Sequence, residues 1–269
     1  MGPALVDTHA HLQDPRFAPD LEAVLQRARQ AGVCAVVTCG TCLASSRQAV
    51  ELARRWHAGH PGPPAVAVYA AVGIHPHEAG GVGDVEAAMA ELRELARQPG
   101  VVAVGEVGLD YHYQLAPPPV QRELLARQLE VASELGLPVV LHSREAVDDV
   151  LELWRALGRG TGVLHAFSGT LAQARQATAL GLYLGVGGMV TFKNAAPLRE
   201  VLRQVELQHL VLETDAPYLA PVPLRGQRNE PSYLVHTANA LAQLLGLLPE
   251  EVAAATTAAA RSLFGLAVA

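Results

Sequence analysis

The sequence is poor in aromatic residues, nearly free of lysine, and lacks a long hydrophobic run. Aromatic residues make up 4% of the 269 residues, and among 20 basic residues Lys193 is the one lysine. The net charge of −6 argues against a protein held to nucleic acid by a broad basic surface, although a local basic pocket can still bind phosphates. No apolar run approaches the roughly 18 residues of a membrane-spanning helix, and the N-terminus does not read as a secretory signal. These absences predict a cytoplasmic protein without a membrane partner.

Cysteine is also scarce, and the three cysteines stand close together at Cys34, Cys39 and Cys42. Their odd number argues against a disulfide framework. Three cysteines without a fourth soft ligand do not complete a tetrahedral zinc site. We therefore expect free thiols near the end of a buried strand.

Short apolar runs alternate with amphipathic stretches along the whole chain. The runs show little polar alternation, which is typical of parallel strands covered by helices on both faces. Amphipathic stretches such as residues 121–136 predict the helices between them. The expected strands are Leu5–Asp7, Val33–Thr38, Val66–Ile74, Val101–Val107, Val139–His142, Gly162–Ala166, Tyr183–Gly187 and Leu210–Glu213.

Eight strand–helix units in this length predict an α/β fold, a single (β/α)₈ TIM-like barrel. A doubly wound sheet would carry a Gly-rich phosphate loop after its first strand, whereas His-Ala-His follows here at residues 9–11. No linker or internal repeat divides the chain, so we expect one domain over residues 1–269.

Histidines and carboxylates follow the expected strands. Barrel enzymes place their chemistry at the C-terminal ends of the strands, so these residues should converge in space. Residues two apart on a strand point to the same side, which would allow His9 and His11 to bind one cation. The strand-end residues are His9, His11, His75, His77, Glu106, His142, His165, Glu213 and Asp215.

Each of these residues also has an ordinary structural explanation. A His-x-His pair is a common chance pattern, Glu106 could be ion-paired, and Asp215 could cap a turn before Pro217. The repeated placement at strand ends favours a metal site instead. Two divalent ions can clamp a phosphoryl or acyl group. Glu106 is suited to bridge them, and Asp215 could also accept a proton from the attacking water.

Six motifs then occur in an order that resembles the TatD family of metal-dependent deoxyribonucleases, from about residue 5 to residue 264. They read "DTHAHL", "GIHPH", "GEVGLDYH", "LPVVLHSREA", "HAFSG" and "ETDAPYLAP…RGQRNEP". The resemblance implies a (β/α)₈ barrel with two divalent ions at the strand ends. It implies one ion held by His9, His11, Glu106 and Asp215, and a second held by Glu106, His142 and His165.

Further residues near the motifs are expected to serve the substrate or the ligands. Asp7 and Glu213 should support the ligands from behind, Asp7 by orienting a ring N–H. Arg228 could instead form a fold-stabilising pair with Glu230 or Glu213. Tyr111 and Tyr113 could stack a base. The expected phosphate contacts are His75, His77, Arg144, Lys193 and Arg228.

The resemblance implies a nuclease that degrades DNA from the 3′ end, with RNA as a second substrate in some members. Mg²⁺ or Mn²⁺ would support activity, while the four imidazole ligands favour tighter binding of Mn²⁺ or Zn²⁺. Two alternatives stay open. The same residues could hydrolyse an ester or amide, such as the bond of a wrongly attached amino acid to tRNA, or the chain could bind metal without catalysis.

Overall fold

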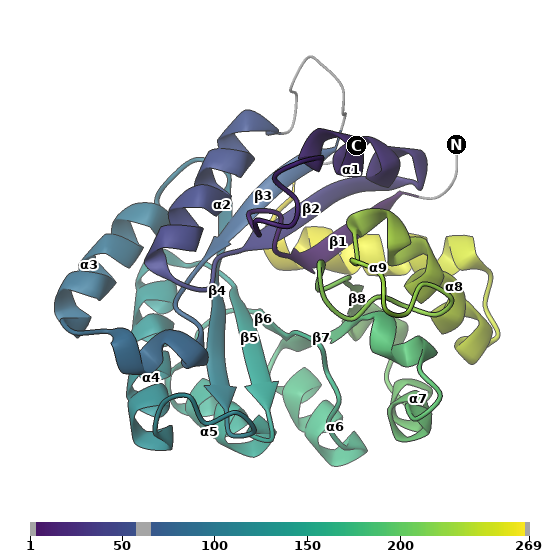
Figure 1. Ribbon diagram of the computed structural model, residues 1–269. Helices are drawn as coiled ribbons and strands as arrows, with labels where there is room; N and C mark the ends of the chain where they lie inside the picture. Colours follow the sequence, from purple (N-terminus) through teal and green to yellow (C-terminus); the bar gives the residue numbers. More distant parts are fainter. Residues whose placement is uncertain (1–3, 58–65, 267–269) are drawn as a thin grey trace.

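The computed structural model describes residues 4–57 and 66–266, and within them eight parallel strands form one sheet in chain order (Figure 1). Each strand pairs with the next one along the chain, and helices cover the outside. The (β/α)₈ prediction is therefore confirmed. The strands are β1 (Leu5–Ala10), β2 (Val33–Cys39), β3 (Ala67–Val72), β4 (Val101–Asp110), β5 (Val139–Arg144), β6 (Gly162–Leu164), β7 (Leu182–Val186) and β8 (Leu210–Leu212).

Helices follow the strands and pack their apolar faces against the sheet. The α-helices are α1 (Leu21–Gln30), α2 (Leu43–Arg55), α3 (Val85–Ala96), α4 (Pro118–Leu135), α5 (Val147–Leu157), α6 (Leu171–Ala179), α7 (Ala196–Leu202), α8 (Leu234–Leu245) and α9 (Pro249–Phe264). Short 3₁₀ turns are η1 (Pro76–Gly81), η2 (Gly188–Thr191), η3 (Leu207–His209) and η4 (Pro231–Tyr233). Among the helices of the described chain, none has the length and apolar character needed to cross a bilayer.

Two apolar clusters divide the interior. The larger lies between the sheet and the surrounding helices, and the smaller lies inside the barrel. The smaller cluster joins Val6, Val37 and Val211 of the strands to Leu263 and Phe264 of α9. Helix α9, yellow in Figure 1, therefore covers one end of the barrel beside β1 and β8 and leaves the opposite end for polar side chains.

The strands end at different residues from those expected. β4 runs on to Asp110 because it stays paired with β5, with Asp110 opposite Arg144. Gly108 permits this close pairing, since a Cβ there would collide with the carbonyl oxygen of His142. β6 stops at Leu164, and Ala166 then takes a left-handed conformation with φ of 46°.

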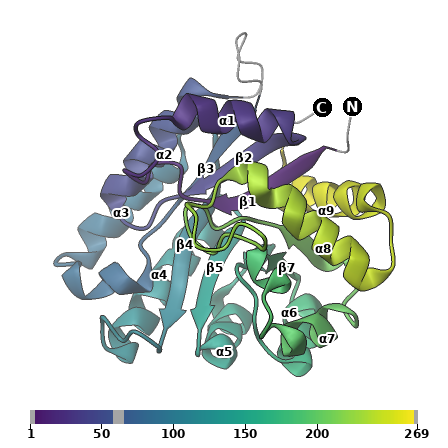
Figure 2. The same ribbon diagram turned by 45° about the vertical axis from the view of Figure 1, so that its right-hand side comes forward.

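The barrel closes between β8 and β1 through a few specific contacts. An isolated parallel bridge joins Ala10 to Ala216, and the N–H of Asp215 donates to the His9 carbonyl at 2.9 Å. Figure 2 shows the segment between β8 and α8 folding back toward β1 across this junction. Two of the expected ligands, His9 and Asp215, are therefore fixed to one another by main-chain bonding.

Candidate metal centre

The two histidines of the first strand direct their rings to a common point. His9 lies in β1 and His11 directly follows it, both are buried, and their Nε2 atoms are 3.2 Å apart. His11 Nδ1 donates to the Cys39 carbonyl at 2.8 Å, and His9 Nδ1 lies 3.5 Å from the Cys39 sulfur. With the proton on Nδ1 in both rings, both Nε2 lone pairs face the same place.

Two carboxylates complete this first group. Glu106 Oε2 lies 3.4 Å from His9 Nε2 and 3.5 Å from His11 Nε2. Asp215 Oδ1 lies 3.7 and 3.5 Å from the same two nitrogens. Four ligands bound tetrahedrally at about 2.1 Å would stand about 3.4 Å apart. The donor atoms therefore already have the spacing of a coordination shell and fit a divalent ion.

A second group forms around the other oxygen of Glu106. Its Oε1 lies 2.9 Å from His142 Nδ1 and 3.0 Å from His165 Nε2, and these two nitrogens are 3.4 Å apart. His142 Nε2 points away, to Asp110 Oδ2 at 3.2 Å, which leaves Nδ1 free to face Glu106. The structure thus gathers the other five expected ligands around the buried carboxylate of Glu106.

The protonation states of Glu106 and of the surrounding imidazoles depend on one another. Burial alone would raise the pKa of Glu106, but the imidazoles of His165, His75 and His9 outweigh burial and hold the pKa well below its usual range. Burial opposes protonation of His165, yet Glu106 and Glu213 raise its pKa well above the ordinary value. Glu106 is therefore an ionised carboxylate, as a metal ligand requires.

Glu213 stands behind His165. It is fully buried, accepts the Ala166 N–H at 2.6 Å, and its Oε1 lies 3.4 Å from His165 Nδ1. Within the described residues, His165 Nδ1 and Glu213 Oε2 have no hydrogen-bond partner. A small approach of the carboxylate to the ring N–H would satisfy His165 and fix its tautomer.

Asp110 is a functional candidate that the sequence reasoning missed. It is buried at the end of β4, accepts from His142 Nε2 and lies 2.7 Å from His77 Nε2. Its position was a usable signal, because residues 106 and 110 on one strand point to the same side. Burial would raise the pKa of Asp110, but the bonds from His142, from the Tyr113 N–H and from His77 lower it.

Asp7 takes a different role from the one expected. Its carboxylate accepts the Thr214 N–H at 2.9 Å, the Thr214 hydroxyl at 2.6 Å and the His9 N–H at 3.3 Å. The expectation that Asp7 orients a ring N–H is replaced by a structural role at the junction of β1 and β8. Burial raises the pKa of Asp7 to about 7.

The expected phosphate contacts occupy different surroundings. His75 is buried among the candidate ligands, with Nε2 3.4 Å from Glu106 Oε1. His77 is half-buried beside Asp110. Arg144 is exposed with its guanidinium carbon 4.5 Å from the Tyr113 ring centre, and Lys193 is exposed after η2.

Arg228 and Tyr111 bind other parts of the protein. The guanidinium of Arg228 donates two hydrogen bonds to Asp20, at 2.7 and 2.8 Å, and one to the Arg16 carbonyl at 2.6 Å. Its distance to Glu230 is 3.8 Å, and Glu230 itself pairs with Arg27. Arg228 therefore fastens the loop after β8 to the start of α1. Tyr111 donates to Asp149 at 2.7 Å.

Asn229 is a second residue that the sequence reasoning passed over. Its buried amide donates to the Thr214 carbonyl at 2.8 Å and the Tyr218 carbonyl at 2.6 Å. These two carbonyls flank Asp215, so Asn229 holds the backbone of this ligand in place. The signal for Asn229 is its place in the "RGQRNEP" motif, directly after Arg228.

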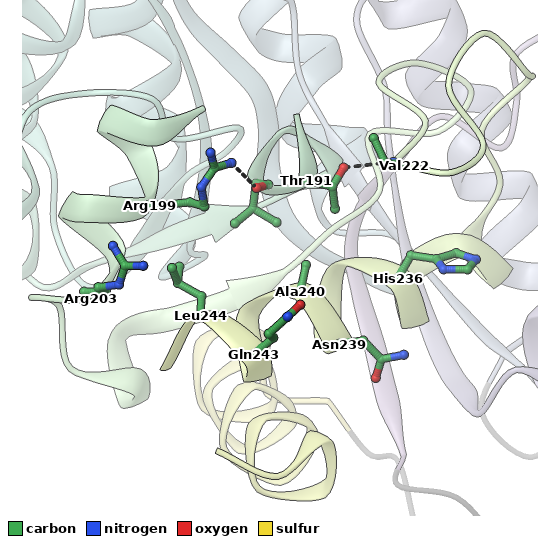
Figure 3. Close-up of a pocket in the computed structure, with 10 residues that line it drawn as sticks. Thr191, Arg199, Arg203, Val222, His236, Asn239, Ala240, Gln243 and Leu244 are labelled. Atoms are coloured by element: carbon green, nitrogen blue, oxygen red, sulfur yellow. Dashed lines mark hydrogen bonds between the residues drawn. The ribbon is translucent and has the colours of Figure 1, made fainter. Parts of the chain in front are cut away.

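A surface pocket near α7 and α8 lies apart from these groups (Figure 3). Its volume is about 610 Å³, and none of the candidate ligands lines it. Arg199 donates there to the carbonyls of Val190 and Phe192, at 3.0 and 2.8 Å. Its guanidinium therefore braces the backbone after β7 instead of offering a free anion site.

The chain is similar to known proteins over nearly its full length. The family described as TatD related DNase matches residues 6–265. An uncharacterized metal-dependent hydrolase TatD of Mycobacterium tuberculosis is 42% identical over 97% of this chain and 98% of its own length. The 3′-5′ ssDNA/RNA exonuclease TatD of Erwinia amylovora is 37% identical over 97% of this chain and 100% of its own length. The crystal structure of YjjV, a TatD homologue of Escherichia coli, superposes with a TM-score of 0.87 at 34% identity, covering 97% of this chain and 98% of that one.

Proposed function

The chain belongs to the TatD-related DNase family of metal-dependent hydrolases, and we propose on this basis that it removes nucleotides from the 3′ end of single-stranded or frayed DNA. A relative of 37% identity, aligned over 97% of the chain, carries the name of a 3′-5′ exonuclease on single-stranded DNA and RNA. RNA is therefore the second substrate to test.

The placement of Glu106 between two groups of imidazoles carries this proposal. One carboxylate oxygen faces His9 and His11, and the other faces His142 and His165. We assign two divalent ions to these groups, Mg²⁺ or Mn²⁺ in the active protein, with Zn²⁺ as a tight competitor because four ligands are imidazoles. Two such ions would neutralise charge at a phosphodiester and would activate water for attack.

Asp215 is our candidate for the group that accepts the proton of the attacking water. Its side chain is 14% exposed, so it lies at the opening of the otherwise buried first group. Burial would raise the pKa of Asp215, but the bond from His11 and the nearby imidazoles lower it. The carboxylate is therefore ionised at neutral pH and able to take up a proton.

The substrate phosphates would meet donors at or after the ends of β3, β5 and β7. We assign this contact to His77, Arg144 and Lys193, and we retain His75 as a donor close to the ligands. Burial lowers the pKa of His75 to about 4, so it offers a neutral imidazole rather than a charge. Arg228 receives no phosphate contact in this proposal because Asp20 occupies its guanidinium.

An oligonucleotide assay tests the proposal. Purified protein stripped of metal is titrated with Mg²⁺ or Mn²⁺ on single strands blocked at the 3′ or the 5′ end. We expect stepwise shortening of the 5′-blocked strand, protection of the 3′-blocked strand, and about a thousandfold lower rate in the Glu106→Gln variant. Cleavage that is independent of metal, or equal in the variant, would contradict the proposal. Release of amino acid from aminoacyl-tRNA at a higher rate would favour the esterase alternative.

Two general expectations accompany this function. We propose that residues 1–269 act as one domain, because the candidate ligands lie in or shortly after the strands of one eight-stranded sheet. The cytoplasmic location stays a prediction from the sequence.

A further inference from the structure

Two exposed tyrosines stand on opposite sides of the candidate metal centre. Tyr113 is 54% exposed and Tyr218 is 48% exposed, whereas the other Phe, Trp and Tyr residues of the described chain are buried or half-buried. Tyr218 meets the ring of His11 edge-on, with ring centres 6.0 Å apart. Tyr113 meets His77 edge-on at 5.4 Å. Each tyrosine therefore lies beside a histidine of the candidate site, Tyr218 beside His11 and Tyr113 beside His77.

The guanidinium group of an arginine lies over each of these tyrosine rings. The guanidinium carbon of Arg16 lies 4.5 Å from the ring centre of Tyr218, and that of Arg144 lies 4.5 Å from the ring centre of Tyr113. The sequence indicates base stacking by Tyr113, but it indicates no role for Tyr218 or Arg16. The second pair needs an explanation of its own.

The Arg16–Tyr218 pair is held in place from both ends. Asp14 accepts two hydrogen bonds from the Arg16 guanidinium, both at 2.8 Å. The N–H of Tyr218 donates to the Asp215 carbonyl at 2.8 Å, and Asn229 donates to the Tyr218 carbonyl. Exposed ion pairs and exposed rings contribute little to folding stability, so the fold gives no reason for this arrangement. A fixed flat surface next to a ligand instead fits the binding of a flat group.

We propose that Tyr218 and Arg16 form a nucleobase site that holds one of the two bases next to the cleaved phosphodiester. The inference rests on the proposed nuclease function and specifies how the strand end is held. An aromatic face binds any base by stacking, and an arginine beside it adds a cation–π contact and N–H donors for the adjoining phosphate. Tyr113 and Arg144 provide the matching surface on the other side of the centre.

Substitution of Tyr218 tests the proposal. Tyr218→Ala removes the ring, Tyr218→Phe keeps it, and Val222→Ala truncates a 44% exposed side chain of the same loop as a control. Binding of a fluorescent single strand is measured in EDTA, and KM and kcat are measured with Mn²⁺. We expect Tyr218→Ala to weaken binding and raise KM about tenfold with kcat little changed, whereas Tyr218→Phe and Val222→Ala behave as the parent protein.

Abasic oligonucleotides identify the contact as a base contact. One strand lacks the 3′-terminal base and another lacks the penultimate base. The proposal requires the effect of Tyr218→Ala to vanish on one of these strands. An equal effect on both, or an alanine variant that binds like the parent protein, would overturn it. Tyr218-dependent binding without degradation of any strand would contradict the nuclease function and leave the base site supported.

Discussion

The two groups of ligands that share Glu106 are supported by different chemistry. On the side of β1, the Nδ1 atoms of the two rings contact neutral groups of Cys39. His11 Nδ1 donates to its carbonyl, and His9 Nδ1 lies beside its thiol. On the side of β5 and β6, carboxylates stand behind the rings, Asp110 for His142 and Glu213 for His165. The candidate metal centre therefore combines two rings backed by neutral groups with two rings backed by carboxylates.

The pKa values of three of the four rings follow this difference. His11 is the exception, because burial opposes its protonation but the bond to Asp215 and the charge of Glu106 outweigh burial and raise its pKa. Burial lowers the pKa of His9, and the neighbouring His165 adds to the effect. Burial also opposes protonation of His142, but the bonds to Asp110 and Glu106 outweigh it and raise the pKa. A more basic imidazole is the stronger metal donor, so the support behind the ring should matter more in the second group.

Substitution of Glu106 should weaken metal binding at both groups of ligands, because the two groups share this carboxylate. Glu106→Gln keeps the shape of the side chain but removes the charge that faces four imidazoles. We expect about a thousandfold loss of nuclease rate, because the stabilisation of several kcal/mol that bound metal supplies is lost. Initial rates on a labelled single strand measure it. Glu130→Gln on α4 is the control, and a comparable loss there would point to misfolding rather than to the centre.

Substitution of the residues that contact the far nitrogens of the rings should affect metal binding differently in the two groups. Glu213→Gln and Asp110→Asn should each weaken metal binding at the second group about 10- to 100-fold, since the supporting carboxylate is lost. Cys39→Ala should weaken the first group by no more than about threefold, because a thiol is a poor acceptor. Calorimetric titration of metal-free protein with Mn²⁺ compares them. A larger effect from Cys39 than from the carboxylates would reverse our ranking of the two groups.

The convergence of the candidate ligands can be predicted from the sequence because of where parallel strands end. Glu106, His142 and His165 are far apart in the chain, yet a barrel must bring the C-terminal ends of its strands together. Their convergence followed from the fold alone.

The supporting residues were harder to predict because they depend on contacts between side chains of different elements. Nothing in the sequence around Asp20 indicates that it binds Arg228, and nothing around Asp7 indicates that it closes the barrel on Thr214. The surroundings of a side chain are set by packing across strands rather than by the periodicity of its own strand.

Removal of Asp7 should affect the fold more than the metal. Asp7→Ala leaves the Thr214 N–H, the Thr214 hydroxyl and the His9 N–H without their acceptor at the junction of β1 and β8. Buried donors of this kind cost about 1–3 kcal/mol each when unsatisfied, so we expect about 3 kcal/mol of destabilisation. Urea denaturation of the metal-free protein measures the change. A large loss of metal affinity with unchanged stability would instead place Asp7 next to the ligands' rings.

The ion pair between Asp20 and Arg228 should produce the smallest effect, confined to acid. Hydrogen bonds from Arg228, reinforced by Arg27, lower the pKa of Asp20 from 3.8 to about 2. A carboxyl with a lowered pKa stabilises the folded state at pH values above its unfolded pKa. That contribution disappears as the pH falls from about 4 to about 2. The free energy of unfolding of Asp20→Asn should therefore lie below that of the parent protein at neutral pH and converge with it near pH 2. A constant difference across this range would exclude the ion pair as the cause.

The sharing of Glu106 by two metal ions is tested most directly by a crystal structure of the protein with Mn²⁺, analysed by anomalous scattering. The account predicts two peaks, one among His9, His11 and Asp215 and one between His142 and His165, with Glu106 bound to both. A single peak, or a second peak away from Glu106, would contradict it.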